Sequence, residues 1–236
     1  MVLLDRNSGQ VLFEKSAHTR LPPASLTKVM TALLALETGR SAATVTIGPE
    51  SVDRRSPSLG LEPGDRLRLG DLVSAMLMLS ANDACWAVAR YVGGSKEAFV
   101  ALMNRKAAAL GLTDSHFSNP CGFDAPDHYS TAADLAHLTE EALKDNALAI
   151  SMRTVEKEIL TVDAKRRFTL RNRTLDESSF TMAKTGFTQK AGHCLIAVAT
   201  QDGRSLLLVG LNFRERWQGA VDVLRYGFES QPADRR

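Results

Sequence analysis

Cysteine is scarce in this sequence and has no recognisable spacing. The 236 residues include three cysteines, at the distant positions Cys85, Cys121 and Cys194. They form no CxxC pair and have no histidine at metal-ligand spacing, which argues against a zinc ribbon or a dithiol redox motif. We therefore expect no metal site. The cysteines are expected to be small buried apolar residues, and their odd number allows one free thiol.

Long apolar runs, an export leader and charge of one sign are also missing. No apolar run approaches the roughly 20 residues that cross a membrane, and no charged-then-apolar leader precedes Val2-Leu3-Leu4. The net charge is +2 with both signs interspersed, without a basic run or basic residues interleaved with aromatics. We therefore expect neither a transmembrane segment nor nucleic-acid binding.

The length and the overall composition of the chain predict one domain spanning residues 1–236. Hydrophobic residues make up 44% of the chain, which is enough for a substantial core at this length. Strands and helices are predicted from the period of the apolar residues and from turn signals. The expected strands are residues 2–5, 10–13, 159–162, 168–170, 180–184, 193–200 and 205–211. The expected helices are residues 25–38, 71–79, 82–91, 95–110, 131–144 and 217–229.

Strands near both ends of the chain flank a mostly helical middle. This order predicts one antiparallel sheet covered by helices, a fold of the α/β (α+β) class. The sheet-containing part is expected at about 1–48 and 150–236, and a mostly helical insert at about 49–149. The apolar face of the last helix is expected to consist of Val221, Leu224, Tyr226 and Phe228.

The stretch 22–28 predicts a helix start that carries chemistry. Two prolines precede a run rich in good helix formers, so a helix begins near Ser25. Ser25 and Lys28 are three apart and lie on one helix face. The lysine can take the serine proton if burial or a second cation lowers its pKa. Alone, the pair favours a simpler interpretation, a helix cap at Ser25 and a solvated charge at Lys28.

Two further short motifs occur in the chain and make a catalytic role for Ser25 and Lys28 more specific. Ser80-Ala81-Asn82 falls at a break between two apolar helices, and Lys184-Thr185-Gly186 ends a predicted strand, where a glycine lets another backbone approach. Each is common alone, because Ser80 and Asn82 can be helix caps and Lys184 an edge-strand charge. SxxK, SxN and KTG nevertheless each occur once, in that order, at boundaries of predicted elements.

This set resembles the signature of penicillin-binding proteins and class A β-lactamases. Flanking residues narrow the resemblance to low-molecular-mass penicillin-binding proteins of the D-alanyl-D-alanine carboxypeptidase and endopeptidase family. The stretches that carry it are 5–9, 61–65, 80–84, 116–122, 129–132 and 184–194. The resemblance covers nearly the whole chain and implies a β-lactamase/transpeptidase-like fold.

The resemblance also implies a role for each motif residue. Ser25 is the nucleophile on the carbonyl between two D-alanines, Lys28 is its base, and Ser80 passes a proton to the leaving amine. The residues implied in substrate binding are Asn82, Lys184, Thr185, Gly186 and Phe187. The backbone amides of Ser25 and Phe187 form the oxyanion hole. Water then hydrolyses the acyl-enzyme, and neither a metal nor a cofactor is required.

The implied partners are peptidoglycan stem peptides as substrates and β-lactam antibiotics as covalent inhibitors. The implied location is the periplasm or another extracytoplasmic part of the cell envelope. The polar tail 231–236 soon after the last helix favours a single-domain, unanchored form. Residues 184–194 are closer to the endopeptidase branch, whereas residues 80–84 fit carboxypeptidases equally well. The bond that is cut and the oligomeric state stay open.

Three other functions are weighed against this one. A class A β-lactamase needs a carboxylate that activates the deacylating water, usually in an ExxxN element, and the sequence has neither ExxxN nor DxxxN. A Ser-His-Asp hydrolase has five histidines available but no GxSxG elbow. A catalytically inactive peptidoglycan-binding module is expected to lack Ser25 or Lys28, and both are present.

Overall fold

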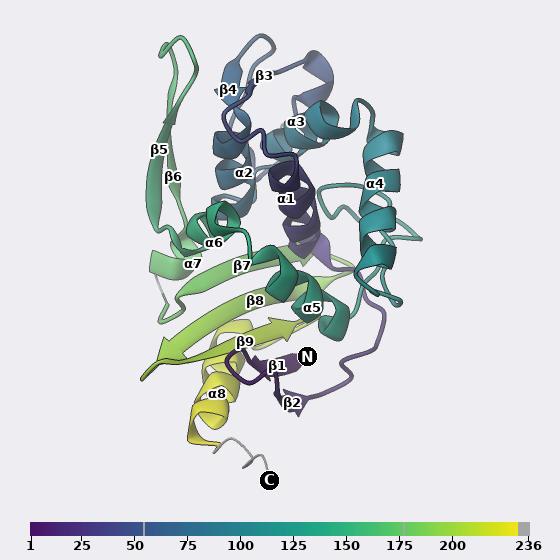
Figure 1. Ribbon diagram of the computed structural model, residues 1–236, viewed down its shortest axis with the longest axis vertical. Helices are drawn as coiled ribbons and strands as arrows, with labels where there is room; N and C mark the ends of the chain where they lie inside the picture. The colour runs from purple at the N-terminus through teal and green to yellow at the C-terminus, as the bar shows by residue number, and fades with distance from the viewer. Residues whose placement is uncertain (54, 177, 231–236) are drawn as a thin grey trace.

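The computed structural model describes residues 1–53, 55–176 and 178–230, so the tail 231–236 lies outside the described residues. Its centre is a five-stranded antiparallel sheet in the order β2-β1-β9-β8-β7 (Figure 1). These strands are β1 Val2–Asp5, β2 Val11–Glu14, β7 Met182–Thr188, β8 Gly192–Gln201 and β9 Arg204–Gly210. The first and last segments of the chain therefore share one sheet, with β7 at its edge.

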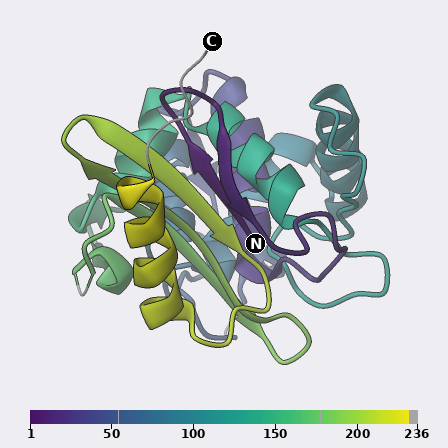
Figure 2. The same cartoon turned by 90° about the horizontal axis from the view of Figure 1, so that it is seen from below.

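Helices cover both faces of this sheet, as Figure 2 shows. The helix α8 Arg216–Glu229 lies on one face. On the other face lies the helical part: α1 Lys28–Glu37, α2 Leu69–Met78, α3 Asn82–Gly93, α4 Lys96–Ala109, α5 Ala132–Ala142 and α6 Asn146–Arg153. Short elements complete it: η1 Ala24–Thr27, β3 Thr44–Thr46, η2 Pro49–Ser51, β4 Arg66–Arg68, β5 Glu156–Leu160, β6 Arg167–Arg171 and α7 Arg173–Asp176.

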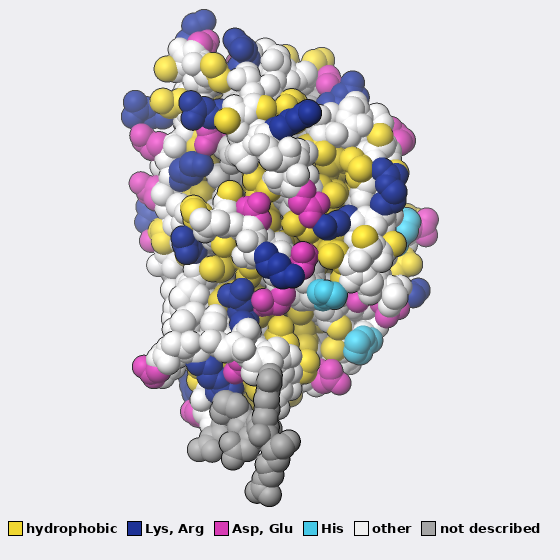
Figure 3. All heavy atoms as spheres, in the orientation of Figure 1, with side chains coloured by type: hydrophobic (Ala, Val, Ile, Leu, Met, Phe, Trp, Pro, Cys, Tyr) yellow, Lys and Arg dark blue, Asp and Glu magenta, His cyan; other side chains and the backbone are white. Residues whose placement is uncertain are grey.

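Successive residues of the central strand β8 supply two hydrophobic cores. In β8, Ile196 faces the core beneath α1, whereas Leu195 belongs to the core beneath α8 together with Leu224. A strand covered on both faces has to be apolar throughout, which explains the unbroken buried run in β8. Lysine, arginine and acidic side chains are interspersed on the face seen in Figure 3, in keeping with the net charge of +2.

The antiparallel sheet and the paired strands at both ends of the chain confirm the predicted fold class. The sequence does not predict α6 or α7. A signal for α6 is present, since the Asp145 carboxylate accepts hydrogen bonds from the Ala147 and Leu148 amides at 2.8 and 3.1 Å, as helix caps do. The hairpin of β5 and β6 is longer than expected and forms a separate two-stranded sheet.

The predicted apolar face of the last helix is partly wrong. Tyr226 is 52% exposed and Val221 36% exposed, whereas Ala220, Leu224 and Gly227 are buried. The helix lies so close to the sheet that a Cβ on Gly227 would come within 2.6 Å of the Leu3 side chain. Small residues therefore make this contact, and a pattern of large apolar residues does not reveal it.

The three cysteines are buried, as expected, but the sequence does not predict that two of them are bonded. Cys85 and Cys121 form a disulfide across 36 residues, with their Cα atoms 5.9 Å apart, and Cys194 is a buried free thiol. A bridge of this length has no sequence signature, because connectivity depends on the fold. Among the described residues, no helix has the length and apolarity needed to cross a membrane.

Candidate active site

Ser25 and Lys28 lie where the short helix η1 passes into α1. Ser25 is partly exposed, whereas Lys28 is fully buried. The Lys28 Nζ lies 2.9 Å from the Ser25 Oγ, 3.0 Å from the Asn82 Oδ1 and 2.7 Å from the Cys121 carbonyl oxygen. The structure thus brings the SxxK pair together with the asparagine of the SxN motif.

Burial lowers the pKa of Lys28 well below its ordinary value, because the charged form loses its hydration. The positive charge of Lys184 lowers the pKa further, and the negative charge of Asp53 opposes both effects. A lowered pKa favours the neutral amine, which is the form that can accept a proton. The environment of Lys28 is therefore that of a base.

Ser80 and Lys184 form the second hydrogen-bonded pair. Ser80 lies at the break between α2 and α3 with φ +61°, an uncommon left-handed conformation for a residue other than glycine. The Lys184 Nζ donates to the Ser80 Oγ at 2.9 Å and to the Thr185 carbonyl oxygen at 2.7 Å. Burial, and then the charge of Arg216, lower the pKa of Lys184 to about 7.

The predicted position of the KTG motif needs a correction. The strand expected at 180–184 is observed as β7 Met182–Thr188, so Lys184, Thr185 and Gly186 lie in the middle of a strand. Gly186 suggests a strand end in the sequence, but here it permits a close approach. A Cβ at Gly186 would lie 3.0 Å from the Ser25 amide nitrogen, so β7 runs directly beside the candidate nucleophile.

The register of β7 turns the Phe187 amide toward the site. Phe187 pairs with His193 of β8, and the His193 carbonyl accepts its hydrogen bond from the Phe213 amide instead. The backbone groups of His193 therefore point away from β7. In an antiparallel pair of this kind the opposite residue also points its N–H outward, so the Phe187 amide lies on the open edge of the sheet.

A second glycine packs against the candidate nucleophile. Gly122 has φ +88°, and a Cβ there would lie 1.8 Å from the Ala24 carbonyl oxygen and 2.9 Å from the Ser25 amide nitrogen. Only glycine fits this position without displacing the chain. Gly122 and Gly186 thus both pack closely against the backbone at Ser25.

A hollow of about 440 Å³ opens beside the second pair of residues. Its lining includes Ser80, Lys184 and Thr185, together with Pro57 and Arg173. The volume is in the range of sites for small ligands, so a molecule of that size placed there would contact Ser80, Lys184 and Thr185.

Sequence reasoning missed two groups at this site. The Cys121 carbonyl acts through the backbone, so no side-chain pattern could have identified it. Arg216 begins α8, and its charge acts on Lys184. Its Nε atom is buried and has no hydrogen-bond partner among the described residues, so it is a candidate to bind an anionic part of a substrate.

His128 contacts Thr27, the residue before α1, and both of its ring nitrogens have structural partners. His128 is buried, its Nε2 lies 2.8 Å from the Thr27 Oγ1, and its Nδ1 accepts from the Ser118 amide at 3.0 Å. Burial lowers the pKa of His128 to about 4. Both ring nitrogens of His128 are therefore engaged away from Ser25, and the candidate base beside Ser25 is Lys28.

Comparison with known proteins identifies one family whose members are similar to this chain in sequence. The D-alanyl-D-alanine carboxypeptidase family, Peptidase_S11, matches residues 1–215. The chain belongs to this family. D-alanyl-D-alanine carboxypeptidase DacC of Escherichia coli (strain K12) is 38% identical over 243 residues, which cover 96% of this chain and 60% of that protein. DacF of Bacillus subtilis (strain 168) is 34% identical, covering 88% of this chain and 55% of that protein.

The fold of this D-alanyl-D-alanine carboxypeptidase family member matches solved structures over nearly its whole length. The crystal structure of the Streptomyces K15 DD-transpeptidase superposes with a TM-score of 0.89 at 27% identity, covering 97% of this chain and 96% of that one. The resemblance found in the sequence and the transpeptidase-like fold are therefore confirmed. The chain spans about 60% of the length of the Escherichia coli relative.

Proposed function

We propose that this chain is a serine DD-peptidase that cuts peptidoglycan stem peptides through an acyl-enzyme. The observation that carries the proposal is the arrangement around Lys28. A neutral amine has two N–H donors and one lone pair. The Asn82 Oδ1 and the Cys121 carbonyl can accept the two N–H groups. The lone pair then remains for the hydroxyl proton of Ser25, 2.9 Å away.

In the proposed acylation, Ser25 attacks the carbonyl of the penultimate D-alanine while Lys28 takes its proton. The amides of Ser25 and Phe187 stabilise the oxyanion, since β7 lies against Ser25 and turns the Phe187 amide outward. Asn82 donates one N–H to the Arg55 carbonyl at 3.2 Å. Its second N–H is assigned to the substrate amide.

Ser80 and Lys184 are assigned to the leaving group. The Ser80 hydroxyl hands a proton to the departing amine and is resupplied through Lys184, 2.9 Å away. The terminal carboxylate of the substrate is assigned to Lys184 and Thr185, which line the hollow. Arg216 adds a further positive charge for the same carboxylate.

β-Lactams are proposed to acylate the same serine and to leave it slowly. Efficient hydrolysis of the penicilloyl ester needs a carboxylate to activate water, and the sequence has no ExxxN or DxxxN element. The chain is therefore assigned as a penicillin target rather than a β-lactamase.

The proposed location is outside the cytoplasm, in the cell envelope. The Cys85–Cys121 disulfide supports this location, because such bonds persist in oxidising compartments and are rare in the cytosol. The relatives that match the chain are named as D-alanyl-D-alanine carboxypeptidases, and this substrate class occurs in the cell wall.

The experiment that tests the function is the release of D-alanine from a stem pentapeptide by the wild type and by Ser25→Ala. We expect release by the wild type and none by the variant. A cross-linked dimer of stem peptides, assayed in parallel, separates carboxypeptidase from endopeptidase activity. Full activity in Ser25→Ala would contradict the assigned nucleophile, and a wild type inactive on both substrates would favour a binding module.

A further inference from the structure

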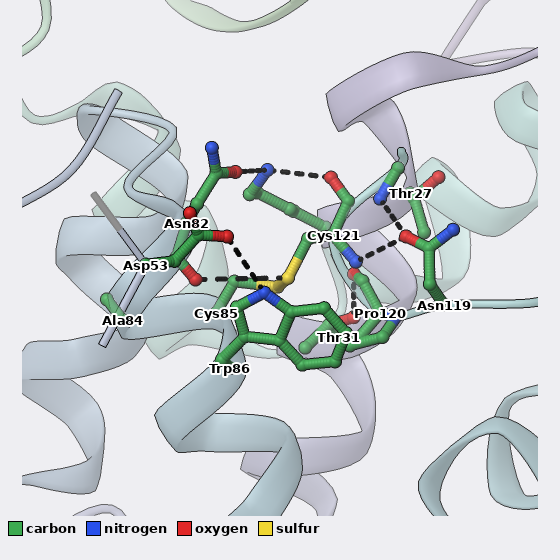
Figure 4. The surroundings of a disulfide bond; sticks show 12 residues. Thr27, Thr31, Asp53, Asn82, Ala84, Cys85, Trp86, Asn119, Pro120 and Cys121 are labelled. Carbon is green, nitrogen blue, oxygen red and sulfur yellow. Dashed lines mark hydrogen bonds between the residues drawn. A yellow bond between two sulfur atoms is a disulfide. The ribbon is translucent and has the colours of Figure 1, made fainter. Parts of the chain in front are cut away.

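The turn 119–123 brings the Cys121 carbonyl within 2.7 Å of the buried Lys28 amine. Figure 4 shows Asn119, Pro120 and Cys121 of this turn beside the disulfide. Asn119 organises this turn through its Oδ1 atom. The amides that donate to it are those of Cys121, Gly122 and Phe123, at 3.2, 2.8 and 3.0 Å. The Thr31 hydroxyl of α1 donates to the Pro120 carbonyl at 2.7 Å. The turn is therefore ordered internally and attached to α1.

The same turn is joined covalently to α3. Cys85 lies in the first turn of α3, three residues after Asn82, so both side chains lie on one face of the helix. Cys85 bonds to Cys121, whose carbonyl is the second acceptor of Lys28. The Cys121 sulfur also contacts the Asn82 carbonyl oxygen at 3.9 Å. The first turn of α3 therefore carries one acceptor of Lys28, the Asn82 amide oxygen, and is bonded to the residue that carries the other, the Cys121 carbonyl.

We propose that the Cys85–Cys121 disulfide is a positioning element for Lys28, holding the Cys121 carbonyl and the Asn82 amide oxygen in place together. Without the bond, no covalent link joins this turn to α3. The stacking of Phe123 on Trp86, with ring centroids 6.3 Å apart, remains, as does the contact of the Cys121 sulfur with the Asn82 carbonyl in the reduced protein. The carbonyl then has freedom to move away from the amine, and water can enter the space between them.

The two states differ in how Lys28 is solvated. Water at the amine stabilises the charged form, so the pKa of Lys28 moves up toward its ordinary value when the bond is absent. The charged groups that act on this amine are Lys184 of β7 and Asp53, which follows η2, and both remain in either state. A higher pKa leaves less neutral amine at a given pH, so acylation of Ser25 slows.

The test compares second-order acylation rate constants with benzylpenicillin from pH 5 to pH 10. The proteins are the wild type, the double variant Cys85→Ala with Cys121→Ala, and Cys194→Ala as a matched loss of a buried cysteine outside the bridge. We expect the double variant to be about tenfold slower near neutral pH, with the acid limb of its profile moved to higher pH. Cys194→Ala keeps the wild-type profile.

A purely structural disulfide gives a different result. In that case the double variant melts at a lower temperature, but its pH profile and rate constant below the melting temperature match those of the wild type. Superimposable profiles therefore overturn the inference. If the double variant does not fold, the folded wild type is reduced with excess dithiothreitol, whose two thiols supply two electrons and two protons and become a cyclic disulfide. Mass mapping with iodoacetamide then verifies two new thiols.

The kinetic readout rests on the proposed function, so a second measurement is independent of it. The pKa of Lys28 is followed by NMR of ¹³Cε-labelled lysine, with the signal assigned by its absence in Lys28→Met. We expect a higher pKa in the double variant or in the reduced protein. An unchanged pKa overturns the inference even if benzylpenicillin does not react, whereas a wild type without an adduct contradicts the function alone.

Discussion

Two buried lysines lie beside two serines in this structure, and their surroundings differ. Lys28 belongs to the helical side and has three oxygen neighbours: a serine, an asparagine and a backbone carbonyl. Lys184 belongs to the sheet edge and has Ser80 and the carbonyl of its own neighbour Thr185. Burial lowers both pKa values, but the surroundings of Lys28 leave a lone pair for the proposed nucleophile, whereas Lys184, with a pKa of about 7, lines the hollow proposed to take the substrate carboxylate. Similar burial thus supports two different tasks.

The largest effect is expected from Lys28→Met, which removes the base and leaves a side chain of similar length. Acylation by benzylpenicillin should fall about 10⁴-fold, at the upper end for a general base. Stopped-flow or quenched mass measurements give the rate constant. Lys165→Met on the exposed β5–β6 hairpin is the control and should react like the wild type. A loss below tenfold in Lys28→Met would contradict the role of base.

Lys184→Met should have the next largest effect, about a 10³-fold loss in kcat/KM on a D-Ala-D-Ala peptide, as for removal of a charge-stabilising donor. Lys184→Arg keeps the charge and should recover part of the loss on this carboxylate substrate. An amidated peptide lacks the carboxylate and should show a smaller difference between wild type and variant. Equal losses on both peptides would contradict the assignment of Lys184 as a binding partner of the substrate carboxylate.

The two glycines that pack against Ser25 should differ in how much a substitution slows acylation. Gly122→Ala places a Cβ 1.8 Å from the Ala24 carbonyl, whereas Gly186→Ala meets the Ser25 amide at 3.0 Å. We expect Gly122→Ala to slow acylation about 10²-fold, because small displacements of reacting groups are costly, and Gly186→Ala to be less affected. Gly9→Ala has a similar positive φ of +77° and nothing within 4 Å. It controls for backbone strain and should acylate normally.

The smallest effect is the pH dependence of the wild type. Since burial lowers the pKa of Lys28, the neutral base is present at lower pH than for an exposed lysine. The acylation rate should rise with pH through the pKa of Lys28, about tenfold from one unit below that pKa to one unit above it. The inflection should lie well below the ordinary lysine value of 10.5. An inflection at the ordinary value would contradict the buried base.

The sequence predicts the Ser25–Lys28 pair better than the Ser80–Lys184 pair. The spacing of Ser25 and Lys28 within one turn predicts their contact, because a helix fixes that geometry locally. Ser80 and Lys184 are 104 residues apart, and their pairing follows from the family resemblance rather than from any local rule. The strand carrying Lys184 was predicted, but its extent was not, since Gly186 weakens the strand pattern in the sequence.

The remainder of the site depends on tertiary contacts that leave no local trace. The Cys121 carbonyl contributes through its backbone, and the disulfide joins segments 36 residues apart. Arg216 precedes an exposed tryptophan, and its surroundings are set by the packing of α8. Packing likewise decides which face of α8 is buried, through Ala220 and Gly227.

The most direct test of the account is the intact mass of the protein after incubation with benzylpenicillin, followed by peptide mapping. We expect one long-lived penicilloyl adduct, located on Ser25 and absent in Ser25→Ala. An adduct on another residue, or rapid hydrolysis of the drug without an adduct, would contradict the assignment of Ser25 and Lys28 as nucleophile and base of a slow-to-deacylate peptidase.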